Sequence, residues 1–202
     1  MRIFDFLFPP RVDEATLRDL SPDDFLASLA PRLAPQTRPG TVVLLPFSHT
    51  SVRAAIHEAK YHGSEHAFRL LGFVLAEYLR DCDDVGHRKS YIMPVPLGKE
   101  RLKERGFNQI EEVAKRVARE LNIPMETNLL VRARETASQV SLPRHEREKN
   151  MRGAFKATQR ANSSYTYILI DDVLTTGATL QAAIDTLQDA GASHIIPLAL
   201  AH

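Results

Sequence analysis

The sequence contains a single cysteine, Cys82, and no tryptophan in 202 residues. One thiol allows neither an intramolecular disulfide nor a zinc cluster built from cysteines, and this fits a reducing compartment. The longest uncharged stretches, 39–52 and 191–202, are shorter than the roughly 20 residues that a membrane-spanning helix needs, and each contains a proline. The apolar stretch 4–8 is interrupted by an aspartate and stopped by prolines, unlike a secretory signal. We therefore expect a soluble, cytoplasmic protein with no membrane partner.

The sequence also has little net charge, because it contains 26 Lys and Arg and 25 Asp and Glu. The charge is nevertheless divided along the chain. Residues 1–87 carry 9 basic and 12 acidic side chains, residues 88–160 carry 17 and 9, and residues 161–202 carry 4 acidic side chains and no basic one. If the protein binds a polyphosphate or a single-stranded nucleic acid, the basic residues that contact it are expected in the middle segment, 88–160.

Residues 1–87 are predicted to be a mostly helical N-terminal accessory segment. Ser21 followed by Pro22 and two acids is typical of a helix start, and this short helix should end near Pro31. Apolar residues at helical spacing predict two further helices, one after residues 48–51 and one over 65–80.

Residues 88–202 are predicted to form an α/β core with a mostly parallel sheet flanked by helices, because short apolar strands alternate there with amphipathic helices. Helices should begin near Asn108 and Ala178. The expected strands are 91–95, 129–131, 165–170 and 195–200. Residues 132–149 are polar and basic and too long for an ordinary connection, so we predict a flexible active-site loop. A solvated tail is the alternative for its arginines.

The most informative segment is 168–179, which reads ILIDDVLTTGAT. A buried strand brings Asp171 and Asp172 to its carboxyl end, where open α/β sheets bind ligands. The loop and helix start that follow offer backbone amides and hydroxyls to a monophosphate, and the acids would face ribose hydroxyls or a hydrated metal ion. A plain turn with a helix cap is the alternative. The candidate phosphate-binding residues are Thr175, Thr176, Gly177, Ala178 and Thr179.

This segment resembles the phosphoribosyl pyrophosphate (PRPP) motif of type I phosphoribosyltransferases. The residues MPVPL at 93–97, Arg101, and RGFNQ at 105–109 look like the signature of the ComF family, a group of competence-associated proteins with that fold. Single residues between 132 and 155 and the residues KYHG at 60–63 also match, so the resemblance covers roughly residues 56–200.

The resemblance implies binding of PRPP with Mg²⁺ and transfer of the phosphoribosyl group to an unknown nucleophile with release of pyrophosphate, together with a role in DNA uptake. It implies that Asp171 and Asp172 contact the ribose and the metal ion, and that Arg101 and Arg105 stabilise the pyrophosphate; these four are the candidate catalytic residues. Further candidate ligand-binding cations are Lys99, Lys103, Arg134 and Arg147. For all of these cations a solvated surface is the alternative.

Many ComF-type proteins begin with a four-cysteine zinc module, and residues 6–10 resemble the phrase that introduces it. Since no cysteine pair follows, we expect no structural zinc. Two other functions stay open at this point. One is a non-catalytic PRPP- or nucleotide-binding module that interacts with a competence helicase, and the other is a protein that binds single-stranded DNA through the basic segment. A dimer is compatible with either.

Overall fold

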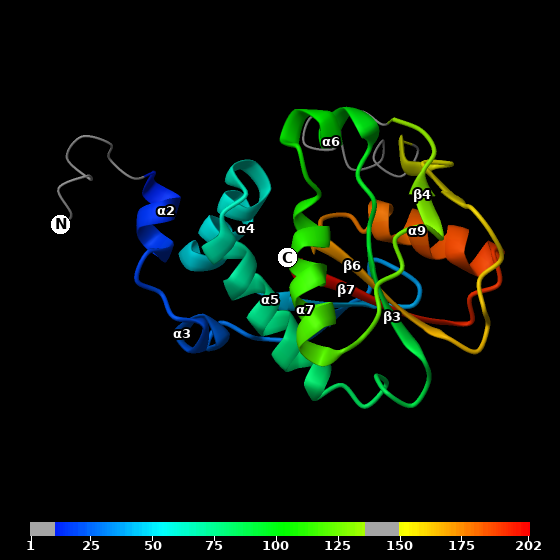
Figure 1. The fold of residues 1–202 in the computed structure, drawn as a ribbon, viewed down its shortest axis with the longest axis horizontal. Helices are drawn as coiled ribbons and strands as arrows, with labels where there is room; N and C mark the ends of the chain where they lie inside the picture. The colour runs from blue at the N-terminus through cyan, green and yellow to red at the C-terminus, as the bar shows by residue number, and fades with distance from the viewer. Residues whose placement is uncertain (1–10, 136–149) are drawn as a thin grey trace.

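The protein, a computed structural model in which residues 11–135 and 150–202 are described, is built around a mixed sheet of five strands in the order β1-β2-β7-β6-β3 (Figure 1). Strands β2, β7, β6 and β3 run parallel to their neighbours, and β1 pairs antiparallel with β2. A separate antiparallel pair is formed by β4 and β5. The strands are β1 (Arg32–Ala34), β2 (Thr41–Leu45), β3 (Ser90–Pro94), β4 (Leu130–Arg132), β5 (Phe155–Ala157), β6 (Thr166–Val173) and β7 (His194–Ala201).

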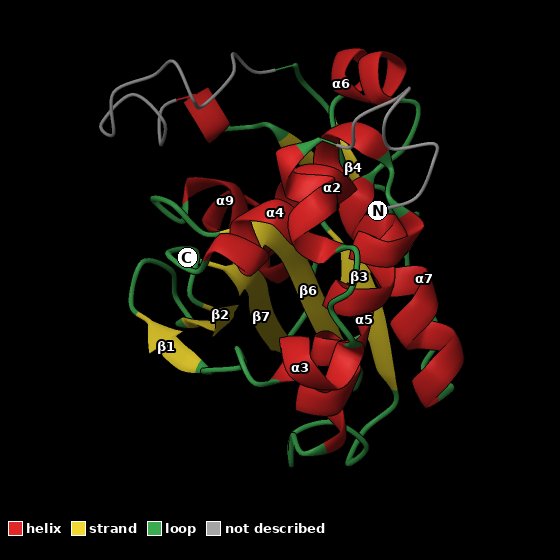
Figure 2. Cartoon of the chain, turned by 90° about the vertical axis from the view of Figure 1, so that its left-hand side faces the viewer, coloured by secondary structure: helices red, strands yellow, loops and turns green. Residues whose placement is uncertain are grey.

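Helices cover both faces of this sheet (Figures 1 and 2). The face packed by α4 (Thr50–His62), α5 (Glu65–Arg80) and α7 (Gln109–Leu121) receives Ile168 and Ile170 of β6. The opposite face, packed by α9 (Ala178–Asp189), receives Leu169. This alternation is expected of a strand buried on both sides, and each buried aliphatic side chain contributes roughly 1.5–3 kcal/mol to folding. The remaining described helices are α2 (Val12–Leu17), α3 (Pro22–Leu26) and α6 (Lys99–Arg105).

The predicted helices and core strands are found at or near their expected places. Helix α5 covers the predicted residues 65–80, and Ser64 caps it by accepting a hydrogen bond from the Ala67 amide. Gly63 ends α4 with φ of 59°, in the left-handed region that favours glycine. Helix α3 starts after Ser21 as predicted but ends at Leu26, before Pro31.

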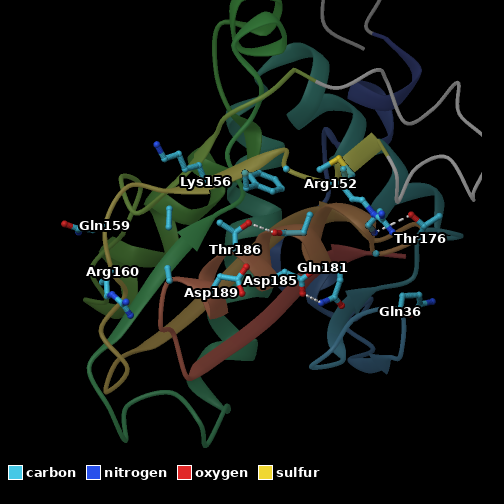
Figure 3. A pocket seen from close by; sticks show the side chains of 18 residues that line it. Gln36, Arg152, Lys156, Gln159, Arg160, Thr176, Gln181, Asp185, Thr186 and Asp189 are labelled. Atoms are coloured by element: carbon cyan, nitrogen blue, oxygen red, sulfur yellow. Dashed lines mark hydrogen bonds between the residues drawn. The ribbon is translucent and has the colours of Figure 1, made fainter.

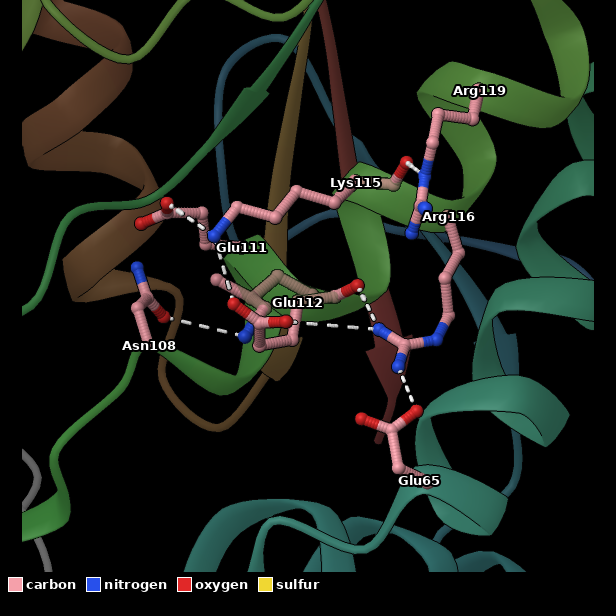
Figure 4. Close-up of polar contacts among 8 residues, drawn as sticks. Glu65, Asn108, Glu111, Glu112, Lys115, Arg116 and Arg119 are labelled. Carbon is pink, nitrogen blue, oxygen red and sulfur yellow. Dashed lines mark hydrogen bonds and ion pairs between the residues drawn. The ribbon is translucent and has the colours of Figure 1, made fainter.

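Polar contacts fix where α7 begins and how it lies against α5 (Figure 4). The side chain of Asn108 accepts a hydrogen bond from the Ile110 amide, and its own amide group donates to the Val95 carbonyl at 3.0 Å. Arg116 of α7 forms an ion pair with Glu65 of α5. These contacts hold the start of α7 beside the end of β3. Gln109, the first residue of α7, is thereby held close to the carboxyl end of β6.

Residues 1–87 also contribute strands. Strand β2 pairs in parallel with the central strand β7, so the segment predicted as a helical accessory contributes β1 and β2 to the main sheet. The residues TVVLL between Gly40 and Pro46 are the kind of short apolar run that buried strands show. The division of the chain into domains at residue 87 stays a prediction.

Some predicted features lie outside the described residues. These are residues 6–10, Arg147, and the part of the predicted loop that spans 136–149. Of the remainder of that loop, Arg132 belongs to β4. Among the described residues, no helix is both long and apolar enough to cross a membrane.

Candidate functional site

Strand β6 ends with the two predicted carboxylates. Asp171 and Asp172 occupy its last positions before Val173, and after a short loop α9 begins at Ala178. The predicted order of strand, acids, loop and helix is therefore present. The residue before α9 is Gly177, which has no side chain to cap the helix, and the positive end of the helix dipole at this start favours an anion.

The turn before α9 requires glycine. Gly177 has φ of 79°, and a Cβ there would lie 2.9 Å from both the Cβ and the carbonyl oxygen of Gln36. Any side chain would force the loop away from the segment that follows β1. Thr176 Oγ1 accepts a hydrogen bond from the Ala178 amide at 3.4 Å, which holds the turn from the other side.

A cavity of about 650 Å³ lies at the carboxyl edge of β6 and β3. Its lining includes all four candidate catalytic residues, together with Thr175 and Thr179 of the phosphate loop. Gly177 and Ala178 line a small hollow that adjoins it and shares Asp171 and Thr175. The other polar side chains that line the large cavity are Arg53, His57, Lys60, Tyr61, Glu104, Asn108, Gln109 and Arg132.

Asp172 is the more strongly held of the two acids. Its Oδ2 lies 3.1 Å from Lys60 Nζ and accepts a hydrogen bond from Gln109 Nε2 at 2.7 Å. Its Oδ1 accepts from the Val173 amide at 2.7 Å. Burial by itself would raise the pKa of Asp172, but the charge of Lys60 and these hydrogen bonds outweigh burial and lower it.

Asp171 lies beside Asp172, and its pKa is shifted in the opposite direction. Burial, and next the negative charge of Asp172, raise the pKa of Asp171 to about 7. Its Oδ1 accepts a hydrogen bond from the Asp172 amide at 2.9 Å. The pair therefore combines one carboxylate fixed in its ionised form with one whose charge is sensitive to a nearby ligand.

Cations face these acids across the cavity. Arg105 Nη1 donates to Gln109 Oε1 at 3.2 Å, and its guanidinium lies 5.4 Å from the centre of the Tyr61 ring. Because Gln109 also donates to Asp172, a continuous polar connection joins a predicted pyrophosphate cation to a predicted ribose acid. Arg101 completes the predicted pair of arginines in the lining.

The other predicted cations are not brought to the same place. Lys99 and Lys103 are exposed on α6 and lie outside the lining of the cavity. Arg134 is exposed and donates to the carbonyl oxygens of Asn150 and Arg152. Glu135 accepts hydrogen bonds from the backbone amides of Lys99, at 2.6 Å, and Glu100, at 3.4 Å, so a carboxylate occupies amides at the start of α6, the helix that carries the two predicted pyrophosphate arginines.

Several lining residues are not among the predicted site residues, and three of them stand out by their charge or their contact with Asp172: Lys60, Gln109 and Arg132. Each lies in a stretch that matched the ComF signature, which was the available signal. Lys60 and Gln109 contact Asp172 from α4 and α7. Burial, and next the charge of Arg101, lower the pKa of Arg132, whose guanidinium lies 4.9 Å from the centre of the Phe155 ring.

The predicted Mg²⁺ fits one acid better than the other. Hydrogen bonds and the Lys60 ion pair engage both carboxylate oxygens of Asp172, so a metal ion there would have to displace the ammonium group. Asp171, partly buried and bordering the cavity, offers the hard oxygen ligand that Mg²⁺ prefers. Of the two acids, Asp171 is therefore the one that could hold a Mg²⁺ ion.

A second groove of about 730 Å³ runs along the outer side of α9 (Figure 3). Lys156 and Arg160 line it together with Asp185 and Asp189 of α9, so its charges are mixed. Thr176, at one end of this groove, belongs to the phosphate loop, whereas Asp171 and Asp172 do not line it.

Known proteins resemble parts of this chain. The family model of the phosphoribosyl transferase domain matches residues 111–201. Competence protein F of Haemophilus influenzae is 35% identical over 106 residues, which cover 52% of this chain and 46% of that protein. DNA utilization protein YhgH of Escherichia coli is 30% identical over 142 residues, covering 69% of this chain and 62% of that protein.

This chain therefore spans about half to three fifths of the length of these two relatives. A solved structure of adenine phosphoribosyltransferase from Leishmania tarentolae superposes with a TM-score of 0.44 and 17% identity, covering 84% of this chain and 79% of that one.

Proposed function

Because the chain belongs to the ComF-type family, whose members carry a phosphoribosyltransferase-type domain, we propose that it binds PRPP with Mg²⁺ in the cavity at the carboxyl edge of β6. We further propose that it transfers the phosphoribosyl group to a nucleophile and releases pyrophosphate. The observation that carries this proposal is the meeting of three features in one place: two adjacent carboxylates, a glycine-dependent phosphate loop and arginines from other elements.

Each feature matches one part of the ligand. The N-terminal end of α9 and the neighbouring Thr175 and Thr179 suit the 5-phosphate, because the helix dipole favours an anion there. Asp171 and Asp172 suit the ribose hydroxyls, which donate hydrogen bonds to carboxylates. Arg101 and Arg105 suit the pyrophosphate, because charge-assisted hydrogen bonds to phosphate oxygens are strong and directional.

In the proposed reaction, the bond between C1 of the ribose and the pyrophosphate oxygen breaks, and its electron pair leaves with the pyrophosphate. The incoming nucleophile donates the pair that forms the new bond at C1. The carboxylates offset the positive charge that develops on the sugar, and the arginines stabilise the leaving group. Bound Mg²⁺ would supply further positive charge to the pyrophosphate. No described residue needs to act as a covalent nucleophile in this scheme.

The names of the two relatives connect those proteins with competence and with the use of DNA. We propose that this chain works in the same setting. A non-catalytic version of the function, in which PRPP is bound but not turned over, is separated from transfer by measuring product.

The experiment measures PRPP binding by isothermal titration calorimetry in Mg²⁺, and pyrophosphate release with a panel of bases and amines. Wild-type protein should bind, and the double variant Asp171→Asn with Asp172→Asn should bind at least about tenfold more weakly, since it loses charged acceptors for the ribose hydroxyls. Glu111→Gln on α7 is the control, because it removes a carboxylate that pairs with Lys115 outside the cavity.

Binding together with pyrophosphate release would support transfer, and binding without release would restrict the function to that of a PRPP-binding module. Equal affinity in wild type and in the double variant would contradict the site. Binding of single-stranded DNA that is lost on raising the salt concentration, without any PRPP binding, would favour the nucleic-acid alternative.

A further inference from the structure

Helix α4 brings a lysine into contact with the acidic pair. Arg53, Ile56, His57 and Lys60 recur at helical spacing and line the cavity along one side of α4. Lys60 extends from the last turn of this helix, and its Nζ lies 3.1 Å from Asp172 Oδ2. The Lys60 side chain is 25% exposed and the Asp172 side chain 12%, so the ion pair is largely removed from solvent.

The pair belongs to a set of contacts that leaves Asp172 little freedom. Gln109 Nε2 donates to the same oxygen at 2.7 Å, and the Val173 amide donates to the other oxygen at 2.7 Å. These donors come from three separate elements: α4, α7 and β6. A side chain held in this way keeps one orientation toward the cavity, which is the requirement for recognising a ring hydroxyl.

The ammonium group of Lys60 also lies where a positive charge would offset the charge of the two acids. Two adjacent carboxylates repel each other and repel a phosphorylated sugar, and an opposite charge within about 4 Å offsets this repulsion. A divalent metal ion is one source of that charge. In this chain Lys60 supplies it to Asp172 from within the fold.

We propose that Lys60 is a positioning residue that takes the place of a divalent cation at Asp172, so that the chain binds ribose 5-phosphate without Mg²⁺. Mg²⁺ is then needed only with the pyrophosphate part of PRPP, beside Asp171. This inference rests on the proposed function, since it concerns the same cavity and the same sugar phosphate.

A purely structural role for Lys60 makes a different prediction. If the ion pair only tied α4 to β6, its loss would lower the unfolding temperature and weaken binding equally with and without metal. If Lys60 replaces a cation, its loss should create a dependence on Mg²⁺ that the wild type lacks, because the metal ion is then free to approach Asp172.

The test measures ribose 5-phosphate binding by calorimetry in EDTA and in MgCl₂. The wild type should bind with the same affinity in both, within about twofold. Lys60→Met should bind at least about tenfold more weakly in EDTA and recover to within about threefold of wild type in MgCl₂, consistent with the loss of one charged hydrogen bond. Lys60→Arg, which keeps the charge, should stay independent of the metal.

Two further variants control this comparison. Lys115→Met removes a positive charge from α7, where Lys115 pairs with Glu111 and Glu112 outside the cavity, and should behave as wild type. In an Asp172→Asn background, Lys60→Met should add little further loss, since coupled residues are not additive. Lys60→Gln, with the same expectation as Lys60→Met, serves if the methionine variant does not fold by circular dichroism.

The outcomes separate the inference from the function on which it rests. Failure of wild-type protein to bind ribose 5-phosphate in either buffer, and to bind PRPP in MgCl₂, would overturn the proposed function and this inference with it. Binding by the wild type combined with an absolute need for Mg²⁺, or a Lys60→Met variant that is equally weak in both buffers, would overturn the inference alone.

Discussion

The backbone at Gly177 packs so closely against residues 36 and 37 that no space is left for a side chain. A Cβ would meet Gln36 Cβ and its carbonyl oxygen at 2.9 Å and Thr37 Cγ2 at 3.1 Å. We expect Gly177→Ala to lower the free energy of unfolding by about 1–3 kcal/mol, because left-handed strain and overpacking add together. PRPP binding should weaken as well, since the phosphate loop has to move.

Gly106→Ala is the matched control for the stability measurement by urea denaturation. Gly106 has φ of 80°, almost the same as Gly177, but a Cβ there would have nothing within 4 Å. The difference between the two variants therefore isolates the contact with Gln36 and Thr37. Equal losses of stability would show that backbone strain alone, and not the close approach, makes glycine necessary.

Glu58 is a buried carboxylate that depends on Arg11. It is 1% exposed and accepts two hydrogen bonds from the arginine, at 3.0 and 2.7 Å. The hydrogen bond from Arg11 is the largest influence on the Glu58 pKa and lowers it against the opposing effect of burial. A lowered pKa stabilises the folded state above the unfolded-state value of 4.5, and this stability is lost as the pH falls through the folded-state value.

Arg11→Met should therefore unfold at a lower urea concentration than wild type at pH 7, and the difference between the two proteins should shrink below about pH 4. Arg38→Met, at an exposed arginine, should differ from wild type by an amount that does not vary with pH. A difference for Arg11→Met that stays constant from pH 7 to pH 3.5 would contradict the role of Glu58.

His57 and His62 lie close enough to Glu58 to form a group that could hold a metal ion, but the Glu58 carboxylate is already paired with Arg11.

At the scale of elements, the sequence predicted well what is encoded locally. The strand, acids, loop and helix of the site lie within twelve consecutive residues, and α5 and α7 have regular apolar faces of their own. Strand β2 was missed although its apolar run was visible, because its partner β7 lies some 150 residues further along the chain. The contact between Lys60 and Asp172 was unpredictable because it depends on where α4 packs against the end of β6.

The start of α6 illustrates the same limit and yields a prediction. Arg101 on this helix was predicted from the signature, but nothing in the sequence pairs Glu135 with the amides of Lys99 and Glu100. Glu135→Gln should bind PRPP about three- to tenfold more tightly, because the carboxylate no longer competes with an anionic ligand for these amides. Calorimetry in MgCl₂ measures the change.

Glu111→Gln, which removes a negative charge from α7 outside the cavity, separates this local competition from a general effect of net charge. Its affinity for PRPP should stay that of the wild type. If Glu135→Gln binds PRPP no more tightly than this control, the carboxylate does not occupy the pyrophosphate position.

For the whole molecule, the near-neutral total charge is the sum of oppositely charged segments, and the fold brings parts of these segments into one site. Arg101, Arg105 and Arg132 come from the basic middle segment, whereas Asp171 and Asp172 come from the acidic C-terminal segment, and all five line the same cavity. The acidic N-terminal segment contributes Lys60 to the same place. The small total charge therefore says little about affinity for a polyphosphate.

The main sheet and its core also draw on both 1–87 and 88–202, and this determines whether residues 88–202 can fold alone. Strand β7 lies between β2 and β6, so removing residues 1–87 would turn it into an open edge. More than half of the buried residues in the cluster beneath α4 and α5 belong to residues 1–87, among them Leu44, Leu71 and Leu75. Their loss would expose the inner faces of β6 and β7 to water, which is far more than the marginal stability of a domain tolerates.

We therefore expect the fragment 88–202 to show no cooperative thermal unfolding by circular dichroism and little dispersion in its amide NMR spectrum. The control is the same chain cut after residue 87 with both fragments co-expressed, because residues 81–89 are mostly exposed and the cut removes no side chain. The two fragments should assemble and bind PRPP together. A fragment 88–202 that unfolds cooperatively by itself would instead support the predicted domain division at residue 87.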